Sequence, residues 1–437
     1  MFKQNKSLRT FLLFVSILAS CKTTTVVKSP PETGSKPDFS NYVAIGNSLT
    51  AGYADGGLYT DGQMNSYPNI IAQQLKPFGG GVFNQPLFPQ GQENGSGHSE
   101  FNGFSTNNKP LIDTVKTHLA IVGKPLVLIP GAPDFLLSKY TNPINNWGIP
   151  GLRVDKIEFT GYGLPGANPY YNRVLTDLEI AGLVPYRDKV LKTNPTFFTC
   201  WLGNSDAIQY ALNGGSDSSN VPLTSQTTFR DVYTRFINLL TAKASKGVLG
   251  TIPDVTITPF FNTITVAQLL TEAKALGVAG VYIQPGTGTV RLAGMKDLIL
   301  LSAAVGRDSL GMKKGFSKNY PLGSYEVLDS LEVIKIQNAV IGYNQTITSI
   351  ASAKGLALMD INVLFNQVRS PGFTADGVPF SPVYITGNVF SLDGVHLTPK
   401  GYALVANAFI GAINTTYHTS IATVDVSKYR GVKTPSN

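Results

Sequence analysis

The chain has 437 residues, of which 43% are hydrophobic and only 14% charged, so it carries enough apolar sequence for one large domain or two smaller ones. Its formal net charge of +8 comes from 35 Lys and Arg residues against 27 Asp and Glu residues. The basic residues are dispersed rather than gathered in a dense run. This composition favours mild affinity for anionic surfaces and argues against a nucleic-acid partner.

The first twenty residues have the layout of a secretory signal. Residues 1–9 carry three basic side chains, and residues 11–19 form an apolar stretch too short to span a membrane. The ending Leu18-Ala19-Ser20-Cys21 resembles a bacterial lipobox, which implies that Cys21 becomes the lipidated first residue of the mature protein. We therefore expect an exported bacterial lipoprotein, anchored to a membrane on its periplasmic face or at the cell surface. The alternative is an ordinary signal peptide that happens to precede a cysteine.

Composition divides the remainder of the chain into three parts. Residues 21–39 are rich in Thr, Lys, Ser and Pro without apolar periodicity, which is typical of a flexible tether. Residues 40–418 are expected to form the folded domain. Residues 419–437 are polar and are predicted to be a frayed tail.

Within the domain, strand-like runs alternate with helical segments, a pattern that predicts an α/β fold with a parallel sheet covered by helices on both faces. The expected strands are residues 42–45, 197–202, 255–258 and 356–360. The expected helices are residues 67–75, 228–244, 264–276, 331–353 and 400–413.

Two polar turns follow expected strands directly. The first reads Gly46-Asn47-Ser48 and the second Gly203-Asn204-Ser205-Asp206. Since ligands bind at the carboxyl ends of the strands in an open parallel sheet, we expect these two turns to be neighbours.

Three long stretches near residues 78–145, 159–195 and 303–324 are expected to be insertions. They are rich in Gly, Pro, Asn and Tyr, and the second carries Tyr162, Tyr170 and Tyr171. Long structured insertions often act as lids or binding loops, although surface elaboration without a function explains each one equally well.

Candidates for a nucleophile and for its base lie at opposite ends of the expected domain. Ser48 occupies a Gly-bounded turn that leaves the first strand, while Asp393 precedes His396 by three residues, just ahead of a helical segment. Hydrolysis by a serine requires a base that takes the hydroxyl proton and a group that orients the base. Each residue alone also suits an ordinary turn or helix cap, so only the fold can unite them.

Other chemistries are less well supported by the sequence. The glycines of residues 161–166 match a dinucleotide-binding spacing, but the following prolines prevent a helix from starting there. The four histidines lack metal-ligand spacing, and Cys200 lies in an apolar run where it should be a buried small hydrophobe. We therefore expect neither a cofactor nor a metal.

Four sequence blocks in order resemble those of the SGNH (GDSL-type) esterase and lipase superfamily: Gly46-Asn47-Ser48-Leu49, Asn146-Trp147-Gly148-Ile149-Pro150-Gly151, Gly203-Asn204-Ser205-Asp206 and Asp393-Gly394-Val395-His396. The resemblance implies a three-layer α/β/α, flavodoxin-like fold. It also implies that Ser48 is the nucleophile, His396 the general base and Asp393 its orienting partner. The backbone N–H groups of Ser48 and Gly151 would then line the oxyanion hole.

The chain departs from the family pattern at two positions. Asn47 replaces the usual aspartate of the first block, and we expect it to preserve the hydrogen bonds of the turn without the charge. In the third block, Ser205 stands where the family places the asparagine of the oxyanion hole, and Asn204 comes one position early. Either Asn204 enters the hole through a shifted turn or Ser205 donates its hydroxyl instead.

Taken together, these features predict a lipid-anchored serine esterase that acts on an acyl lipid or an acetylated carbohydrate through an acyl-enzyme. Acyl transfer to an acceptor other than water stays open, because the same three residues would serve it. A binding lipoprotein that has kept the fold and lost activity is the alternative from another class, motivated by Asn47 and Ser205. The oligomeric state is not predicted.

Overall fold

The computed structural model describes residues 36–127, 132–216, 221–243, 245–286, 288–303, 306–307, 311–369 and 372–435. The signal segment, Cys21 and most of the expected tether therefore lie outside the described residues.

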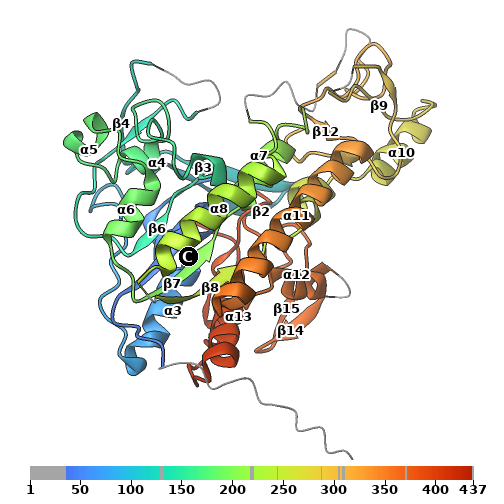
Figure 1. Ribbon diagram of the computed structural model, residues 1–437. Helices are drawn as coiled ribbons and strands as arrows, with labels where there is room; N and C mark the ends of the chain where they lie inside the picture. Colours follow the sequence, from blue (N-terminus) through green and yellow to red (C-terminus); the bar gives the residue numbers. More distant parts are fainter. Residues whose placement is uncertain are drawn as a thin grey trace, which may run out of the picture. The chain divides into compact units, whose positions relative to one another are not determined.

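A five-stranded parallel sheet forms the centre of the domain (Figure 1). Its strands, in spatial order, are β13 (Ala357–Met359), β8 (Lys246–Gly250), β7 (Phe197–Trp201), β1 (Tyr42–Gly46) and β6 (Asn146–Gly148). Read in the opposite direction, from β6 to β13, and numbered by their order along the chain, the strands follow the order 2-1-3-4-5 of flavodoxin-like sheets. The strand order reverses beside β1, and the predicted three-layer α/β fold class is confirmed.

Successive side chains of each strand point to opposite faces of the sheet, so the apolar side chains form two hydrophobic cores, one on each face. Val43, Ile45, Phe198 and Cys200 belong to one core. The other core contains Tyr42, Ala44, Phe197 and Trp201 of the same strands. The first core packs against α6 (Tyr186–Lys192), α8 (Gln226–Thr241) and α11 (Ser330–Lys354). The second core packs against α3 (Tyr67–Leu75), α12 (Ile361–Arg369) and α13 (Pro399–Tyr417). In Figure 1, α8 and α11 cross in front of the sheet.

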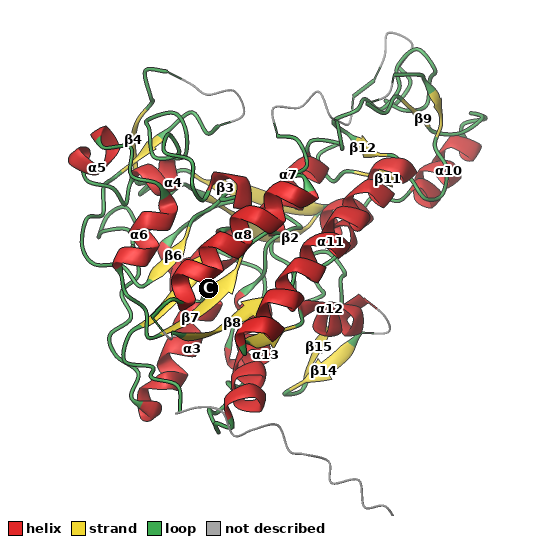
Figure 2. Cartoon of the chain, in the orientation of Figure 1, coloured by secondary structure: helices red, strands yellow, loops and turns green. Residues whose placement is uncertain are grey.

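Shorter elements surround this frame (Figure 2). The short helices are α1 (Ser48–Ala51), α2 (Thr60–Met64), η1 (Lys76–Phe78), η2 (Val154–Lys156), α4 (Pro169–Asn172), α5 (Asp177–Ala181), α7 (Asn204–Leu212), η3 (Val255–Ile257), α9 (Pro259–Asn262), α10 (Val266–Ala275) and η4 (Val426–Lys428). The two-stranded sheets are β2 (His98–Phe104) with β3 (Pro110–Val115), β4 (Ile121–Gly123) with β5 (Leu136–Leu137), β9 (Tyr282–Ile283) with β10 (Arg291–Leu292), β11 (Leu298–Ile299) with β12 (Val327–Leu328), and β14 (Phe373–Ala375) with β15 (Val378–Phe380).

One expected strand is wrong. Residues 255–257 form η3 instead, because the Asp254 carboxylate accepts the Thr256 N–H, and after Thr258 the helix α9 starts at Pro259. The fourth strand of the sheet is β8, whose sequence Lys-Gly-Val-Leu-Gly carries a weak strand signal. Gly247 is needed there because a Cβ would lie 2.6 Å from the carbonyl oxygen of Phe198 on β7.

The prediction that the residues after Thr419 are frayed is also wrong. Asn407 and Asn414 on α13 each exchange hydrogen bonds with the backbone of this segment, at Val424 and Ile421 respectively. Ile421 and Val426 are buried in the second core. We call residues 419–435 the strap.

Candidate active site

Ser48 lies at the carboxyl end of β1, where the strand order of the sheet reverses. Asn47 caps α1, and its side-chain oxygen accepts the Leu49 N–H at 3.2 Å, so the expected role of Asn47 in the turn is confirmed. Ser48 begins α1, and the first N–H of a helix has no intrahelical acceptor. β6 approaches this helix so closely that a Cβ on Gly148 would lie 2.2 Å from the Ala51 nitrogen.

The fold brings Ser48 and His396 into contact across 348 positions of sequence. The Ser48 Oγ lies 2.8 Å from His396 Nε2, and His396 Nδ1 lies 2.9 Å from an oxygen of Asp393. Both distances suit hydrogen bonds, and the three side chains form a continuous chain from hydroxyl to imidazole to carboxylate. This arrangement can move a proton from the serine to the histidine while the carboxylate orients the ring.

The Asp393 carboxylate is held by donors from two segments. One oxygen accepts the N–H groups of Val395 and His396 at 2.9 and 2.8 Å, and the other accepts the Gly56 N–H at 3.0 Å. Burial acts to raise the pKa of Asp393, but the His396 ring and these hydrogen bonds prevail and lower the pKa to about 2. Asp393 is therefore ionised wherever an esterase would work.

Tyr53 supports the imidazole from the side. Its ring centroid lies 4.5 Å from that of His396, and its hydroxyl donates to the Gly56 carbonyl oxygen at 2.7 Å. Since Gly56 also donates to Asp393, the segment from Tyr53 to Gly56 contacts both partners of the serine.

The two predicted polar turns are neighbours, as expected. β1 and β7 pair in parallel with Gly46 opposite Trp201, so the turn that starts at Gly203 opens beside Ser48. Gly203 has a φ of 105°, a conformation that suits glycine, and α7 begins directly after it.

Side-chain amides hold the loop that carries Gly151. Asn168 donates to the Pro150 carbonyl oxygen and Gln209 donates to the Gly151 carbonyl oxygen, both at 2.9 Å. Gly151 itself has a φ of 79°. These bonds fix the carbonyls of the loop and with them the direction of the adjoining N–H groups.

Asp206 anchors the same loop to α7. Its two oxygens lie 3.1 and 2.9 Å from the Val154 nitrogen, and it accepts the Thr224 hydroxyl at 2.6 Å. Burial raises the pKa of Asp206 to about 7, and the nearby Arg153 opposes this shift. Asp206, from the block Gly203–Asp206, thus holds the loop that follows the block Asn146–Gly151.

Ser205 and Asn204 occupy different environments. Ser205 lines the cavity that also contains Ser48, Gly151 and His396, whereas Asn204 is not among its lining residues. The Asn204 side chain is buried, and neither of its amide atoms has a hydrogen-bond partner among the residues that the structure describes.

The cavity beside Ser48 has a volume of about 630 Å³. Its apolar lining comes from α7 and the loops around it, while Lys156, Asp155 and Arg153 supply charge on one side. The second predicted insertion contributes Phe159, Tyr162 and Tyr170, but Tyr171 packs in the core. The first insertion contributes Pro133, and the described part of residues 303–324 contributes nothing to the lining.

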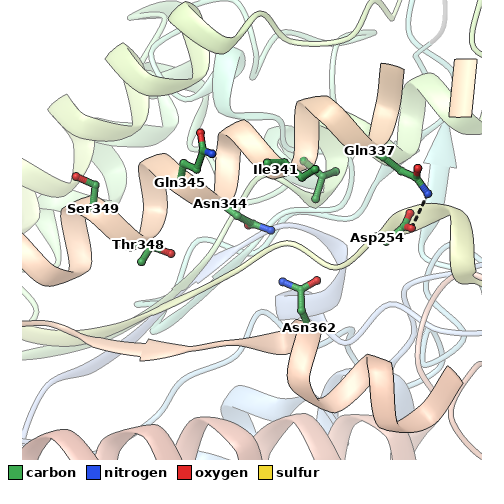
Figure 3. A pocket seen from close by; sticks show the side chains of 9 residues that line it. Asp254, Gln337, Ile341, Asn344, Gln345, Thr348, Ser349 and Asn362 are labelled. Atoms are coloured by element: carbon green, nitrogen blue, oxygen red, sulfur yellow. Dashed lines mark hydrogen bonds between the residues drawn. The ribbon is translucent and has the colours of Figure 1, made fainter. Parts of the chain in front are cut away.

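A second cavity, of about 720 Å³, lies along α11 and shares no residue with the first. Figure 3 shows Gln337 of α11 directed at Asp254 and Asn344 on the side of the helix that faces Asn362, whereas Gln345 and Ser349 point away from these two residues. Several of these groups already bind the protein: Gln337 donates to Asp254 at 2.9 Å, and Asn344 pairs with the backbone of Ile252. The cavity therefore has the character of a groove between packed elements.

The sequence did not indicate the residues that position Asp393, His396 and the Gly151 loop through hydrogen bonds and packing. Tyr53, Asp55 and Gly56 follow the Ser48 turn without a distinctive motif, Asn168 lies within the second expected insertion, and Gln209 follows the third block in a segment without a predicted role. Only their proximity to the four blocks could have indicated them.

The sequence matches the model of the GDSL-like lipase/acylhydrolase family over residues 42–409. The chain belongs to this family. It is an ester-hydrolysing enzyme of the GDSL type, and the predicted family and enzyme class are confirmed. No functionally curated protein sequence matches this GDSL enzyme.

Three solved structures similar to the enzyme are an α/β hydrolase from the metagenome of Lake Arreo, Spain, a lipase/acylhydrolase from Enterococcus faecalis and a family 3 carbohydrate esterase from Clostridium thermocellum. Their sequence identities are 12%, 11% and 11%, and their TM-scores are 0.36, 0.34 and 0.33. The matches cover 87%, 88% and 87% of this chain and 97%, 98% and 98% of theirs. At this distance nothing about substrate passes from those proteins to the GDSL enzyme.

Among the described residues, no three His, Cys, Asp or Glu side chains are grouped so that they could hold a metal ion. In the same part of the chain, no helix combines the length and apolar character that a membrane span requires. Cys200 is buried, as expected, and burial raises the pKa of its thiol to about 12.

Proposed function

We propose that this GDSL enzyme is an exported, lipid-anchored serine esterase that cleaves carboxylic esters through an acyl-enzyme on Ser48. The observation that carries the mechanism is the contact of Ser48 with His396 and of His396 with Asp393, at 2.8 and 2.9 Å. The lipid anchor rests on the lipobox-like sequence ending in Cys21.

In this mechanism His396 takes the proton of the Ser48 hydroxyl as its oxygen attacks the ester carbonyl carbon. Asp393 keeps the proton on His396 Nδ1, so that Nε2 is free to accept the serine proton. The carbonyl oxygen becomes negative and is stabilised by the N–H groups of Ser48 and Gly151. His396 then protonates the leaving alcohol, and the acyl group stays on Ser48.

Water completes the reaction by the same route in reverse. His396 removes a proton from a water molecule, whose oxygen attacks the acyl carbon, and the Ser48 oxygen leaves with that proton. The products are a carboxylic acid and an alcohol. An acceptor alcohol in place of water would give acyl transfer through the same intermediate.

The cavity beside Ser48 fits two substrate classes. An acyl lipid would lay its chain along apolar residues such as Ile208, Leu212 and Val221, whereas an acetylated carbohydrate would place its sugar against Tyr170 and the polar groups of Gln209. The volume of about 630 Å³ exceeds what an acetyl group alone fills, so in the second case the sugar must occupy most of it.

The test uses the fragment that begins after Cys21. We expect a fluorophosphonate probe to label it once, on the peptide that contains Ser48, and we expect it to hydrolyse p-nitrophenyl esters. If kcat/KM rises from acetate to octanoate, the acyl lipid is favoured; if it falls, the acetylated sugar is favoured. A folded protein that is neither labelled nor active would instead support the binding lipoprotein.

For the oxyanion hole we propose Ser205 rather than Asn204 as the side-chain donor. Replacing Ser205 with alanine is expected to lower kcat by about 10²–10³-fold, which is the usual loss for one such donor. Asn204→Ala is the matched control, and it should leave kcat within about threefold and the melting temperature unchanged or raised, because its buried amide has no partner among the described residues. Steady-state kinetics of both variants decide between them, and a larger loss in Asn204→Ala would contradict the proposal.

A further inference from the structure

A second carboxylate, Asp55, lies behind the Ser48–His396–Asp393 chain. Asp55 is fully buried with a φ of 55°, and it accepts the Leu392 N–H at 3.0 Å. Its own N–H donates to the Ser391 hydroxyl at 2.9 Å, and that hydroxyl lies 3.2 Å from Asp393. Asp55 therefore holds the two residues that immediately precede Asp393.

The residue after Asp55 reaches Asp393 directly, through the Gly56 N–H. A displacement of Asp55 would thus move both the turn before Asp393 and one of the donors to its carboxylate. The position of the carboxylate that orients His396 depends on where Asp55 is held.

Arg430 holds Asp55 from the other side. One guanidinium nitrogen lies 3.8 Å from the Asp55 carboxylate, and another donates at 2.8 Å to the Tyr59 hydroxyl, which itself donates to Asp55 at 2.7 Å. Asp61 fixes the guanidinium through two bonds of 3.0 and 2.6 Å. Burial raises the pKa of Asp55, and Arg430 opposes this shift, so the arginine favours the ionised form that the Leu392 N–H binds best.

The strap delivers Arg430 to this place. Its backbone is held at Asn414 and Asn407 of α13, at Asp376 through the Val426 N–H, and at Lys400, whose N–H donates to the Arg430 carbonyl oxygen. Beyond Arg430, the Lys433 carbonyl oxygen accepts the Phe101 N–H of β2. The strap lies outside residues 42–409, so the family match does not include it.

We propose that Arg430 is a positioning residue for the Asp393–His396 pair and acts on it through the buried Asp55. The contacts run from the guanidinium to Asp55, from Asp55 to the Ser391–Leu392 turn and Gly56, and from these to Asp393. This role rests on the proposed function, because it concerns the orientation of the base that serves Ser48.

The test compares Arg430→Met with Lys428→Met, which removes a cation from an exposed position of the same strap. With active sites counted by fluorophosphonate labelling, Arg430→Met is expected to lower kcat per labelled site by about 10- to 100-fold, the scale of a slightly misplaced catalytic group. KM should stay within about twofold, because Arg430 touches no part of the substrate cavity. Lys428→Met should match the wild type, and Arg430→Lys should recover most of kcat.

A double-mutant cycle with Asp55→Asn tests the route. In the Asp55→Asn background, Arg430→Met should change kcat by less than about twofold, because the carboxylate on which the arginine acts is gone. Additive losses, or an unchanged kcat in Arg430→Met, would overturn the proposal. If Arg430→Met does not fold, Arg430→Gln decides: a lowered kcat supports the proposal and an unchanged kcat overturns it.

The two proposals fail in different ways. If the wild type is not labelled on Ser48, the proposed function is wrong. If the wild type is labelled and turns over while Arg430→Met keeps its kcat, only the role of Arg430 is wrong.

Discussion

Replacing Ser48 with alanine is expected to abolish labelling by a fluorophosphonate and to lower kcat by about 10⁵–10⁶-fold, the scale seen when a serine nucleophile is removed. His396 Nε2 lies 2.8 Å from the Ser48 Oγ, and among the described residues no other hydroxyl group contacts this nitrogen. KM should change little, because the serine side chain fills only a small part of the cavity. Progress curves with a p-nitrophenyl ester and gel fluorescence of the labelled protein provide the measurements.

Ser349→Ala is the matched control for this experiment. Ser349 is an exposed serine on α11 that lines the other cavity, so its loss should affect neither labelling nor turnover (Figure 3). Residual labelling in Ser48→Ala, lost on changing a different serine, would assign the nucleophile elsewhere.

Replacing Asp393 with asparagine is expected to lower kcat by about 10⁴-fold while leaving the fold intact. The amide oxygen can still accept the Val395 and His396 N–H groups, but the amide NH2 replaces the oxygen that faces the Gly56 N–H and His396 Nδ1, and it can only donate to the ring. The imidazole then adopts the tautomer in which Nε2 carries the proton, and this nitrogen can no longer accept the proton of Ser48. Pre-steady-state acylation rates measure this loss, and a loss below about tenfold would rule out Asp393 as the orienting group.

The same variant should reveal the low pKa of Asp393 in stability measurements. The pKa of about 2 lies below the value of about 3.9 expected in the unfolded chain, so the carboxylate stabilises the fold above about pH 4 and loses this effect as the pH falls towards 2. The free-energy difference between wild type and Asp393→Asn should therefore narrow by about 2 kcal/mol over that range. Urea unfolding at several pH values tests this, and a difference independent of pH would contradict it.

Much of the fold could be predicted because local and global signals agree in its core elements. β1, β7 and β13 are short apolar runs that end in polar turns, and α3 begins and ends at the predicted residues 67 and 75. The errors arose where the local signal was misleading. The Val-Thr-Ile-Thr run of residues 255–258 has strand propensity, but the Asp254 cap and Pro259 give it a helical turn.

The strap shows the opposite error, because its polar composition predicted a frayed tail and the structure holds it against α13. Asn407 and Asn414 on α13 satisfy the backbone of the strap, and its Ile421 and Val426 are buried in the second core. No pattern within residues 419–435 reveals this, because the partners lie on another element and are recognised only when the helix and the strap are side by side.

The four blocks, the α/β class and the identity of the side chains able to perform acyl chemistry can be recognised in the sequence, because these depend on residue type and short-range spacing. The contact of Ser48 with His396, the place of Ser205 rather than Asn204 in the cavity lining and the approach of Arg430 to Asp55 depend on the folded chain. Hydrogen bonds require approach to about 3 Å, and between residues hundreds of positions apart that approach is set by the packing of the sheet and its helices.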